Sequence, residues 1–294
     1  MNFSEVSARL FPWDFADEKP DDIIDNLERD TLTNSIYPVI LMHDEKRPLS
    51  EFYYPHNPKR KVYWTEDSRA YWKFDPDFYK ESRIKPIPSE NEELMHTDWV
   101  EFSSALARSR GLKAGVELSH TWVDKARLHG EYADCLQQNI EGRPDSVRLC
   151  PNNPDTRAYA RALYSELATR YDLDFIQTCF HGFSGPSYRE KISEVERLIR
   201  LPLSTCFCPH CQYAAERKGL NWSAIVDRVK WMAAGHNHYN HKQAFELNLL
   251  RHSTMTASQL FFEIPEFYAW LRFRTESYTG FWKEIHSAAH EACP

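Results

Sequence analysis

Four of the seven cysteines have the spacing of a metal site. Cys206, Cys208 and Cys211 form the compact run CFCPHC, and Cys150 lies upstream in RLCPNNPDTR. Three thiolates spaced C-x-C-x2-C on a short turn, together with a fourth cysteine, can bind one tetrahedral Zn²⁺. Such a site is closed to substrate, so the pattern predicts a structural zinc ion held by a loop at 204–213 and leaves catalysis to other residues. Buried free thiols are the alternative interpretation.

Composition indicates a globular chain without nucleic-acid or membrane partners. The 294 residues are 42% hydrophobic and 27% charged, and the formal net charge is -7, so no domain-wide basic character favours nucleic acid. No apolar stretch approaches the length of a membrane span, and the first fifteen residues lack the basic start and apolar core of a signal peptide. An odd number of cysteines, three of them crowded together, fits a reducing compartment, which predicts a cytoplasmic protein.

Short apolar runs alternate with helical patterns along the first two thirds of the chain. This order predicts parallel strands joined by right-handed helical crossovers, which are consecutive βα units of a barrel. After CFCPHC the patterns are helical only. The expected strands span 7–15, 35–43, 112–122 and 173–180, and the expected helices 21–29, 98–110, 153–171, 221–234, 242–252 and 264–292.

Four βα units cannot close an eight-stranded barrel, because an open parallel edge remains. The sequence therefore predicts a single partial TIM-barrel domain over 1–294, in the α/β class, that corresponds to the N-terminal half of a (β/α)8 fold. A longer polypeptide, a second chain or another copy of this chain could complete the sheet, or the sheet could stay open.

A resemblance to a known family rests on the cysteines and their surroundings. The stretch LCPNNPDTRAYARALYSELATRYDLDFIQTCFHGF, followed by CFCPHCQYAA, resembles the zinc-bearing β-galactosidases of glycoside hydrolase family 42 and their uncharacterised glycoside-hydrolase-like relatives. The similarity covers roughly residues 110 to 215. It implies that Cys150, Cys206, Cys208 and Cys211 are zinc ligands, with Cys150 fitting better than His210, and that the fold is a (β/α)8 barrel acting on carbohydrate.

The same comparison shows a departure at the fourth strand. Members of that family end this strand with Trp-Gln-x-Asp-Asn-Glu, in which the last residue is the general acid/base. Here the matching stretch is IQTCFH, so Gln177 is kept and His181 stands in place of the acid. The family nucleophile belongs to a seventh strand, which this chain does not contain, whereas a retaining glycosidase uses two carboxyl groups about 5 Å apart.

Polar side chains at the expected carboxyl ends of the strands are the candidates for catalysis and binding, because barrel active sites lie there. Glu117 and His120 on the third strand and His181 on the fourth are the predicted catalytic residues. Glu117 could equally form a structural ion pair with Lys113 or Arg161. The predicted substrate-binding residues are Asp14, His43, Trp64, Asn152 and Gln177.

Trp64 belongs to a long aromatic-rich βα loop at 44–97, whose rings could stack on a sugar or form the loop's own small core. Together these features predict a carbohydrate-active enzyme of glycoside-hydrolase-like type that acts on a glycoside. One alternative is a catalytically inactive carbohydrate-binding or assembly subunit. Another is a metal-dependent sugar isomerase or lyase that uses the strand-end histidines.

Overall fold

The computed structural model describes residues 4–42, 57, 59, 68–119, 122–179, 194–204, 206–236 and 257–293. It divides the chain into two compact units. The first comprises Met1–Glu131, Ala158–His181 and Ile285–Pro294, and the second comprises Tyr132–Arg157 and Gly182–Glu284. No helix among the described residues is long and apolar enough to cross a membrane.

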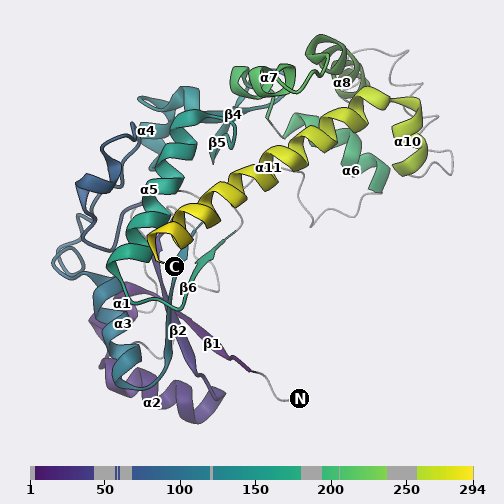
Figure 1. Ribbon diagram of the computed structural model, residues 1–294. Helices are drawn as coiled ribbons and strands as arrows, with labels where there is room; N and C mark the ends of the chain where they lie inside the picture. The colour runs from purple at the N-terminus through teal and green to yellow at the C-terminus, as the bar shows by residue number, and fades with distance from the viewer. Residues whose placement is uncertain are drawn as a thin grey trace. The chain divides into compact units, whose positions relative to one another are not determined.

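A parallel sheet of four strands is the centre of the first unit (Figure 1). Its order is β1 (Ser7–Leu10), β2 (Ser35–Leu41), β3 (Lys113–Leu118) and β6 (Phe175–Thr178). All neighbouring pairs run parallel, which confirms the four predicted strands and their direction. The first strand is shorter than predicted, because Pro12 starts a helix where its fixed backbone angle is already helical.

Helices connect the strands of the first unit. They are α1 (Pro12–Asp17), α2 (Pro20–Thr31), α3 (Trp99–Ser109) and α4 (Lys125–His129), with α5 (Pro154–Arg170) leading to β6. The Asp98 carboxylate caps α3 by accepting from the backbone N–H groups of Val100 and Glu101. The helix stops before Gly111, whose φ of 70° is the left-handed conformation that glycine tolerates best. Helices at 21–29, 98–110 and 153–171 were predicted, and α2, α3 and α5 confirm them.

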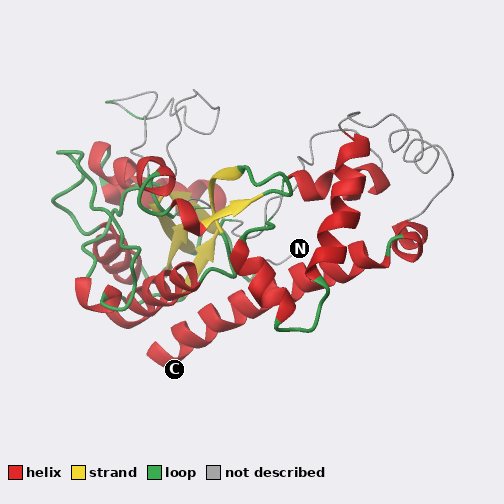
Figure 2. Ribbon diagram, turned by 90° about the horizontal axis from the view of Figure 1, so that it is seen from above, coloured by secondary structure: helices red, strands yellow, loops and turns green. Residues whose placement is uncertain are grey.

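One face of the sheet packs against helices. Ile36 of β2 and Ala114 of β3 belong to the same buried cluster as Trp99 and Ala107 of α3. Because successive residues of a strand face opposite sides, the side chains of Tyr37 and Glu117 extend from the other face, where Gly115 also lies. The sheet and its helices are seen from above in Figure 2. In the part of the chain that the structure describes, this sheet is open, with β1 and β6 at its edges. The closed or half barrel stays a prediction, as does a single domain over 1–294.

The segment before α3 is anchored to α5 by one buried carboxylate. The Glu166 side chain is fully buried and accepts hydrogen bonds from Trp72 Nε1 at 3.2 Å, the Asp75 backbone N–H and Tyr79 Oη at 2.6 Å. Arg170, one turn along α5, supplies the countercharge at 2.6 Å. Tyr79 ends a 3-10 turn, Pro76–Tyr79. The described part of the aromatic loop is therefore held on α5 by a buried charged acceptor, while its Tyr71 belongs to the same buried cluster as Ile36 of β2.

The second unit is mostly helical. Its elements are the antiparallel hairpin of β4 (Leu136–Gln138) and β5 (Pro144–Leu149), then α6 (Glu194–Arg200), α7 (Pro209–Glu216), α8 (Trp222–His236), α10 (Ala257–Glu263) and the part of α11 (Pro265–Ala292) up to Glu284. The aromatic residues Phe207, Trp222 and Trp270 pack together in its core, with the Phe207 and Trp270 rings stacked 5.0 Å apart. The predicted helices at 221–234 and 264–292 are confirmed by α8 and α11. The one at 242–252 lies outside the described residues, and the hairpin was not predicted.

We expect Glu166→Gln to destabilise the protein by about 3 kcal/mol or more, because it leaves Arg170 next to a neutral amide and places an N–H group among buried donors. Urea unfolding at neutral pH measures the change. The control is Asp30→Asn, which removes an exposed ion pair with Arg29. It should leave the free energy of unfolding nearly unchanged, because water screens the pair. Equal losses in the two variants would contradict this account of the anchor.

Candidate functional site

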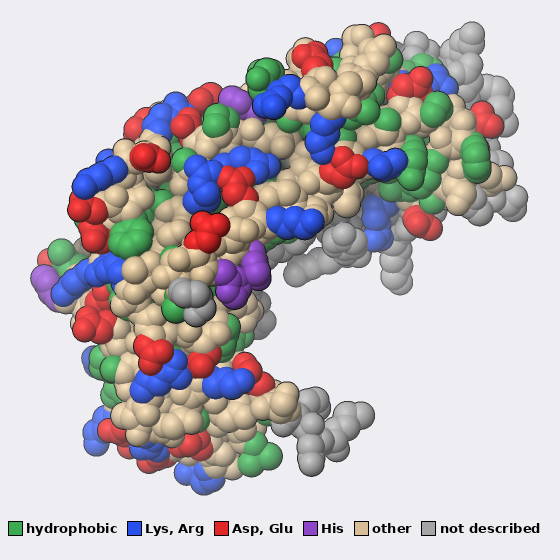
Figure 3. Space-filling view, in the orientation of Figure 1, with side chains coloured by type: hydrophobic (Ala, Val, Ile, Leu, Met, Phe, Trp, Pro, Cys, Tyr) green, Lys and Arg blue, Asp and Glu red, His purple; other side chains and the backbone are tan. Residues whose placement is uncertain are grey.

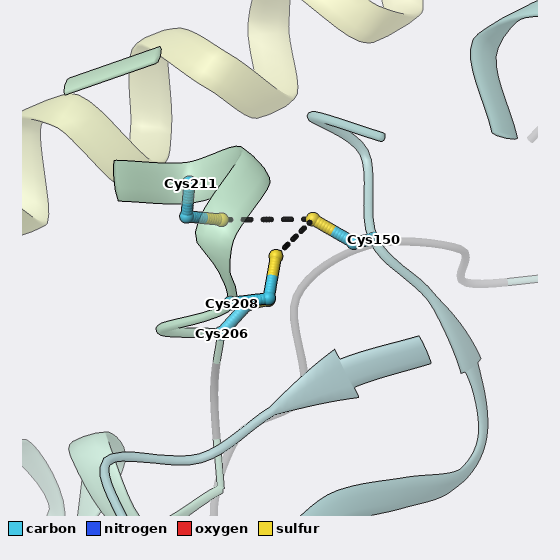
Figure 4. Close-up of side chains that lie close together, drawn as sticks. All are labelled: Cys150, Cys206, Cys208 and Cys211. Carbon is cyan, nitrogen blue, oxygen red and sulfur yellow. Dashed lines mark hydrogen bonds between the residues drawn. The ribbon is translucent and has the colours of Figure 1, made fainter. Parts of the chain in front are cut away.

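The four cysteines come together in the second unit although 61 residues separate Cys150 from Cys211 (Figure 4). Cys150 directly follows β5, and its N–H bonds the Cys135 carbonyl at 2.8 Å. Cys206 and Cys208 lie on either side of Phe207, whose N–H bonds the Gln138 carbonyl of β4. Cys208 is the N-cap of α7. The hairpin and the start of α7 thus hold the two parts of the cluster against each other.

The geometry of this cluster fits a tetrahedral metal. The four Sγ atoms lie within 4.8 Å of one another, and Cys150 Sγ is 3.5 Å from Cys208 Sγ and 3.6 Å from Cys211 Sγ. Four sulfurs bound to zinc at 2.3 Å would be about 3.8 Å apart, whereas a disulfide is about 2.05 Å long. All four cysteines are free and buried. His210 is not part of the group.

Two N–H groups of Asn152 point to sulfurs of the cluster. The Asn152 backbone N–H points to Cys150 Sγ at 3.4 Å, and its side-chain Nδ2 to Cys211 Sγ at 3.3 Å. Burial raises the pKa of the Cys150 and Cys211 thiols, since a thiolate out of water needs compensation. The two N–H donors of Asn152 compensate part of the thiolate charge, and a bound dication would compensate the remainder. Asn152, predicted to bind substrate, is thus directed at sulfur.

A buried ion pair lies at the carboxyl end of the parallel sheet. Glu117, the last residue but one of β3, is 2% exposed and accepts from Arg9 Nη2 of β1 at 2.8 Å. Burial raises the pKa of Glu117, and the attraction of Arg9 opposes this. The Arg9 side chain is itself 39% exposed. An ion pair of Glu117 with Lys113 or Arg161 was one of two alternatives from the sequence. The structure pairs Glu117 with Arg9, and Lys113 with Glu5.

Aromatic and amide groups extend this polar face toward β6. Gln177 is in register with Glu117 and is exposed, and its side chain bonds Tyr37 of β2. The Phe175 ring packs edge-on against Tyr37 at 5.8 Å and covers Gly115, where a Cβ would lie 2.3 Å from the ring. Only glycine leaves room for that ring. The face thus combines an ion pair, an amide and an aromatic surface, the groups that recognise a polar ring-shaped ligand.

Arg9 and Tyr37 were missed by the sequence analysis. Arg9 stands between Ala8 and Leu10 in a short strand, and no local pattern pairs it with Glu117, because Arg9 is in register with Tyr37 of β2 whereas Glu117 is in register with Val39. His43, Trp64, His120 and His181, which the sequence analysis placed at or near the strand ends, lie outside the described residues. Their convergence with Glu117 stays a prediction.

Asp14 follows β1 at this same edge and has a different environment. Its Oδ2 accepts from the Phe11 N–H at 2.8 Å and so caps its own helix. Its Oδ1 is buried and has no hydrogen-bond partner among the described residues. The pKa of Asp14 is raised from 3.8 to about 7, chiefly by burial and to a lesser extent by the charges of Glu18 and Asp17, while the hydrogen bond from the Phe11 N–H opposes the rise. This carboxyl group thus keeps its proton close to neutrality.

An aromatic cavity lies in the described part of the long loop. Its volume is about 270 Å³, and its lining includes Tyr71, Trp72, Phe74, Leu94 and Met95. The edge of Trp72 is bonded to Glu166, so its orientation is fixed by the anchor described above. Trp64, the aromatic residue predicted to bind substrate, is not among the described residues.

No family model and no curated protein matches the sequence. Among solved structures, the fold is similar to part of α-L-fucosidase isoenzyme 2 from Paenibacillus thiaminolyticus, with a TM-score of 0.50 and 13% sequence identity. The match covers 100% of this chain and 31% of the fucosidase, so the chain spans about a third of the length of that enzyme. This similarity is one of fold: part of a glycosidase has a mixed α/β architecture like the one described above.

The pKa of Asp14 predicts a pH dependence of stability. Between about pH 4 and pH 7 the folded protein keeps a proton that the unfolded chain has released, so the free energy of unfolding should fall as pH rises through this range and level off above it. The amide of Asp14→Asn does not titrate in this range. We therefore expect the variant to gain stability relative to the wild type between pH 5 and pH 8, by on the order of 3 kcal/mol. Urea unfolding at both values measures the gain.

The matched control is Asp22→Asn, at an exposed position in the first turn of α2. Its difference from the wild type should be the same at pH 5 and pH 8. A constant difference for Asp14→Asn as well would show that Asp14 titrates normally.

Proposed function

We propose that this chain is a glycoside-hydrolase-like protein that acts on a glycoside at the carboxyl ends of its parallel strands and holds a structural zinc ion in the second unit. The observation that carries the proposal is the buried Glu117 carboxylate, paired with Arg9 and in register with the exposed Gln177. Parallel α/β sheets bind ligands at this edge. The fold likeness to part of a fucosidase agrees with it.

The proposed chemistry assigns different work to the two carboxyl groups at this edge. Arg9 favours the ionised form of Glu117, which suits it to accept hydrogen bonds from sugar hydroxyls or to face developing positive charge. Asp14 keeps its proton near pH 7, the state that a general acid requires. The fourth strand offers Gln177, an amide, to orient the ring. A carbohydrate-binding subunit without turnover would use the same groups.

The zinc proposal rests on the donor set and its geometry. Cys150, Cys206, Cys208 and Cys211 would hold the ion, and four thiolates leave no open position for substrate. When bound, such an ion cross-links the hairpin to the start of α7 and neutralises buried thiolates. Asn152 would orient two of the sulfurs through its N–H groups.

Metal analysis of protein purified without chelator should give one zinc per chain. Cys208→Ser should lose it and unfold at a lower temperature, because losing a structural ion costs several kcal/mol and each kcal/mol moves Tm by about 2–4 °C. Cys179→Ser, at a cysteine outside the group, is the control and should keep its zinc. Wild-type protein that contains no metal and is unchanged by EDTA would refute the site.

Glycoside turnover tests the sheet edge. Against a panel of aryl glycosides that includes α-L-fucosides and β-D-galactosides, we expect Glu117→Gln to lower kcat/KM about 100-fold or more, with little change in Tm because Arg9 reaches solvent. Glu5→Gln is the matched control, since Glu5 pairs with Lys113 near the start of β3 and should leave turnover intact. Ligand binding by NMR without turnover would support the binding subunit. Neither binding nor turnover would contradict the proposal.

A further inference from the structure

Two histidines are stacked on the outside of the long helix α11. His286 and His290 are one helical turn apart, and their ring centroids are separated by 4.2 Å with the planes inclined at 42°. Both side chains are exposed. Figure 3 shows histidine side chains gathered on the surface at this end of α11. Histidines at positions i and i+4 of a helix are the arrangement by which one helical face presents two imidazoles to a metal ion.

The helix around this pair is fixed on its other side. Ile285, just before His286, is only 2% exposed, and the Ala288 carbonyl between the two histidines accepts from Ser165 Oγ of α5 at 3.2 Å. These contacts orient the turn without using either imidazole. The two rings therefore share a surface that is directed to solvent, where their side chains can rotate toward a common ion.

Cys293 provides a third donor on the same face. Its N–H bonds the Ala289 carbonyl at 3.0 Å, so the backbone continues the helical course through this residue. With about 100° between successive residues, positions 286, 290 and 293 fall within an arc of roughly 60°. The Cys293 side chain is exposed. The sequence H-S-A-A-H-E-A-C thus places two imidazoles and one thiol along two turns of helix.

We propose that His286, His290 and Cys293 form a second, surface metal site for a divalent late transition ion of the zinc class. Two imidazoles bound to one tetrahedral ion through bonds of about 2.1 Å have their ring centres roughly 5.2 Å apart, about 1 Å more than the 4.2 Å observed, so rotation of the exposed side chains would open the stacked pair around the ion. The partial negative charge at the helix C-terminus favours a cation there. Two nitrogens and one sulfur leave a position for water or an exchangeable ligand.

This site differs from the four-cysteine group in charge and access. Four thiolates around a dication give a net negative, buried centre that retains its ion, whereas two neutral imidazoles and one thiolate on the surface bind an ion that can exchange. A competing metal added to the purified protein should therefore enter the surface site first. The proposal does not depend on the glycoside function, and it can succeed or fail without it.

Cobalt titration of the full chain, purified with its resident metal, tests the site. We expect the wild type to take up one further Co²⁺ with a thiolate-to-cobalt charge-transfer band in the near ultraviolet. His286→Ala and His290→Ala should each weaken this binding about 10- to 100-fold, at least as much as the loss of an outer-shell partner. Cys293→Ser should keep weakened binding through the imidazoles and lose the charge-transfer band.

The matched control moves one histidine off the face. The double variant His290→Ala, Glu291→His keeps the number of histidines but places the second ring about 140° around the helix from the first. It should bind Co²⁺ as weakly as His290→Ala. Circular dichroism checks that every variant keeps its helix. Equal cobalt affinity in the wild type and the displaced variant, or no cobalt uptake beyond the resident metal in the wild type, would overturn the proposal.

Discussion

The convergence of four buried sulfurs is the constraint on which the second unit depends. Cys150 ends a two-stranded hairpin, and Cys206, Cys208 and Cys211 surround the start of α7, so local elements of little intrinsic stability meet at one point. A hairpin and an eight-residue helix are marginal alone. Uncharged thiols would contribute only ordinary packing, whereas a cation among thiolates would bond to all four at once. The aromatic stack of Phe207 on Trp270 then builds outward from the same turn.

Two buried carboxyl groups of the first unit, Glu166 and Asp14, have contrasting hydrogen-bond environments. Glu166 is fully buried but accepts from an indole, a backbone N–H, a phenol and a guanidinium, so its charge is distributed over partners that it also holds in place. Asp14 has one backbone donor, and its second oxygen has no partner among the described residues. A carboxylate with four donors stabilises a loop, while one with a single donor is left able to exchange its proton.

Much of the fold could be predicted from the sequence, because periodicity and chain punctuation are local. Pro154 after Asn153 marked the start of α5, Gly111 marked the end of α3, and the apolar run after Ser35 marked β2. The hairpin at 136–149 was not found, since it is short and polar and owes its form to the cysteine turn. Contacts between distant segments were predicted least well: the partner of Glu117 is Arg9, 108 residues away, and no local pattern identifies it.

The two metal-site interpretations show when spacing alone is informative. In CFCPHC the cysteines are so close that almost any compact turn brings the sulfurs together, so the spacing by itself indicates a cluster. The spacing of His286, His290 and Cys293 is informative only on a helix, because in a strand residues 290 and 293 would face opposite sides. It is the hydrogen bond from Cys293 to Ala289 that places the thiol on the histidine face. The sequence shows which donor types are present, but the backbone conformation determines which of them lie close enough to share a site.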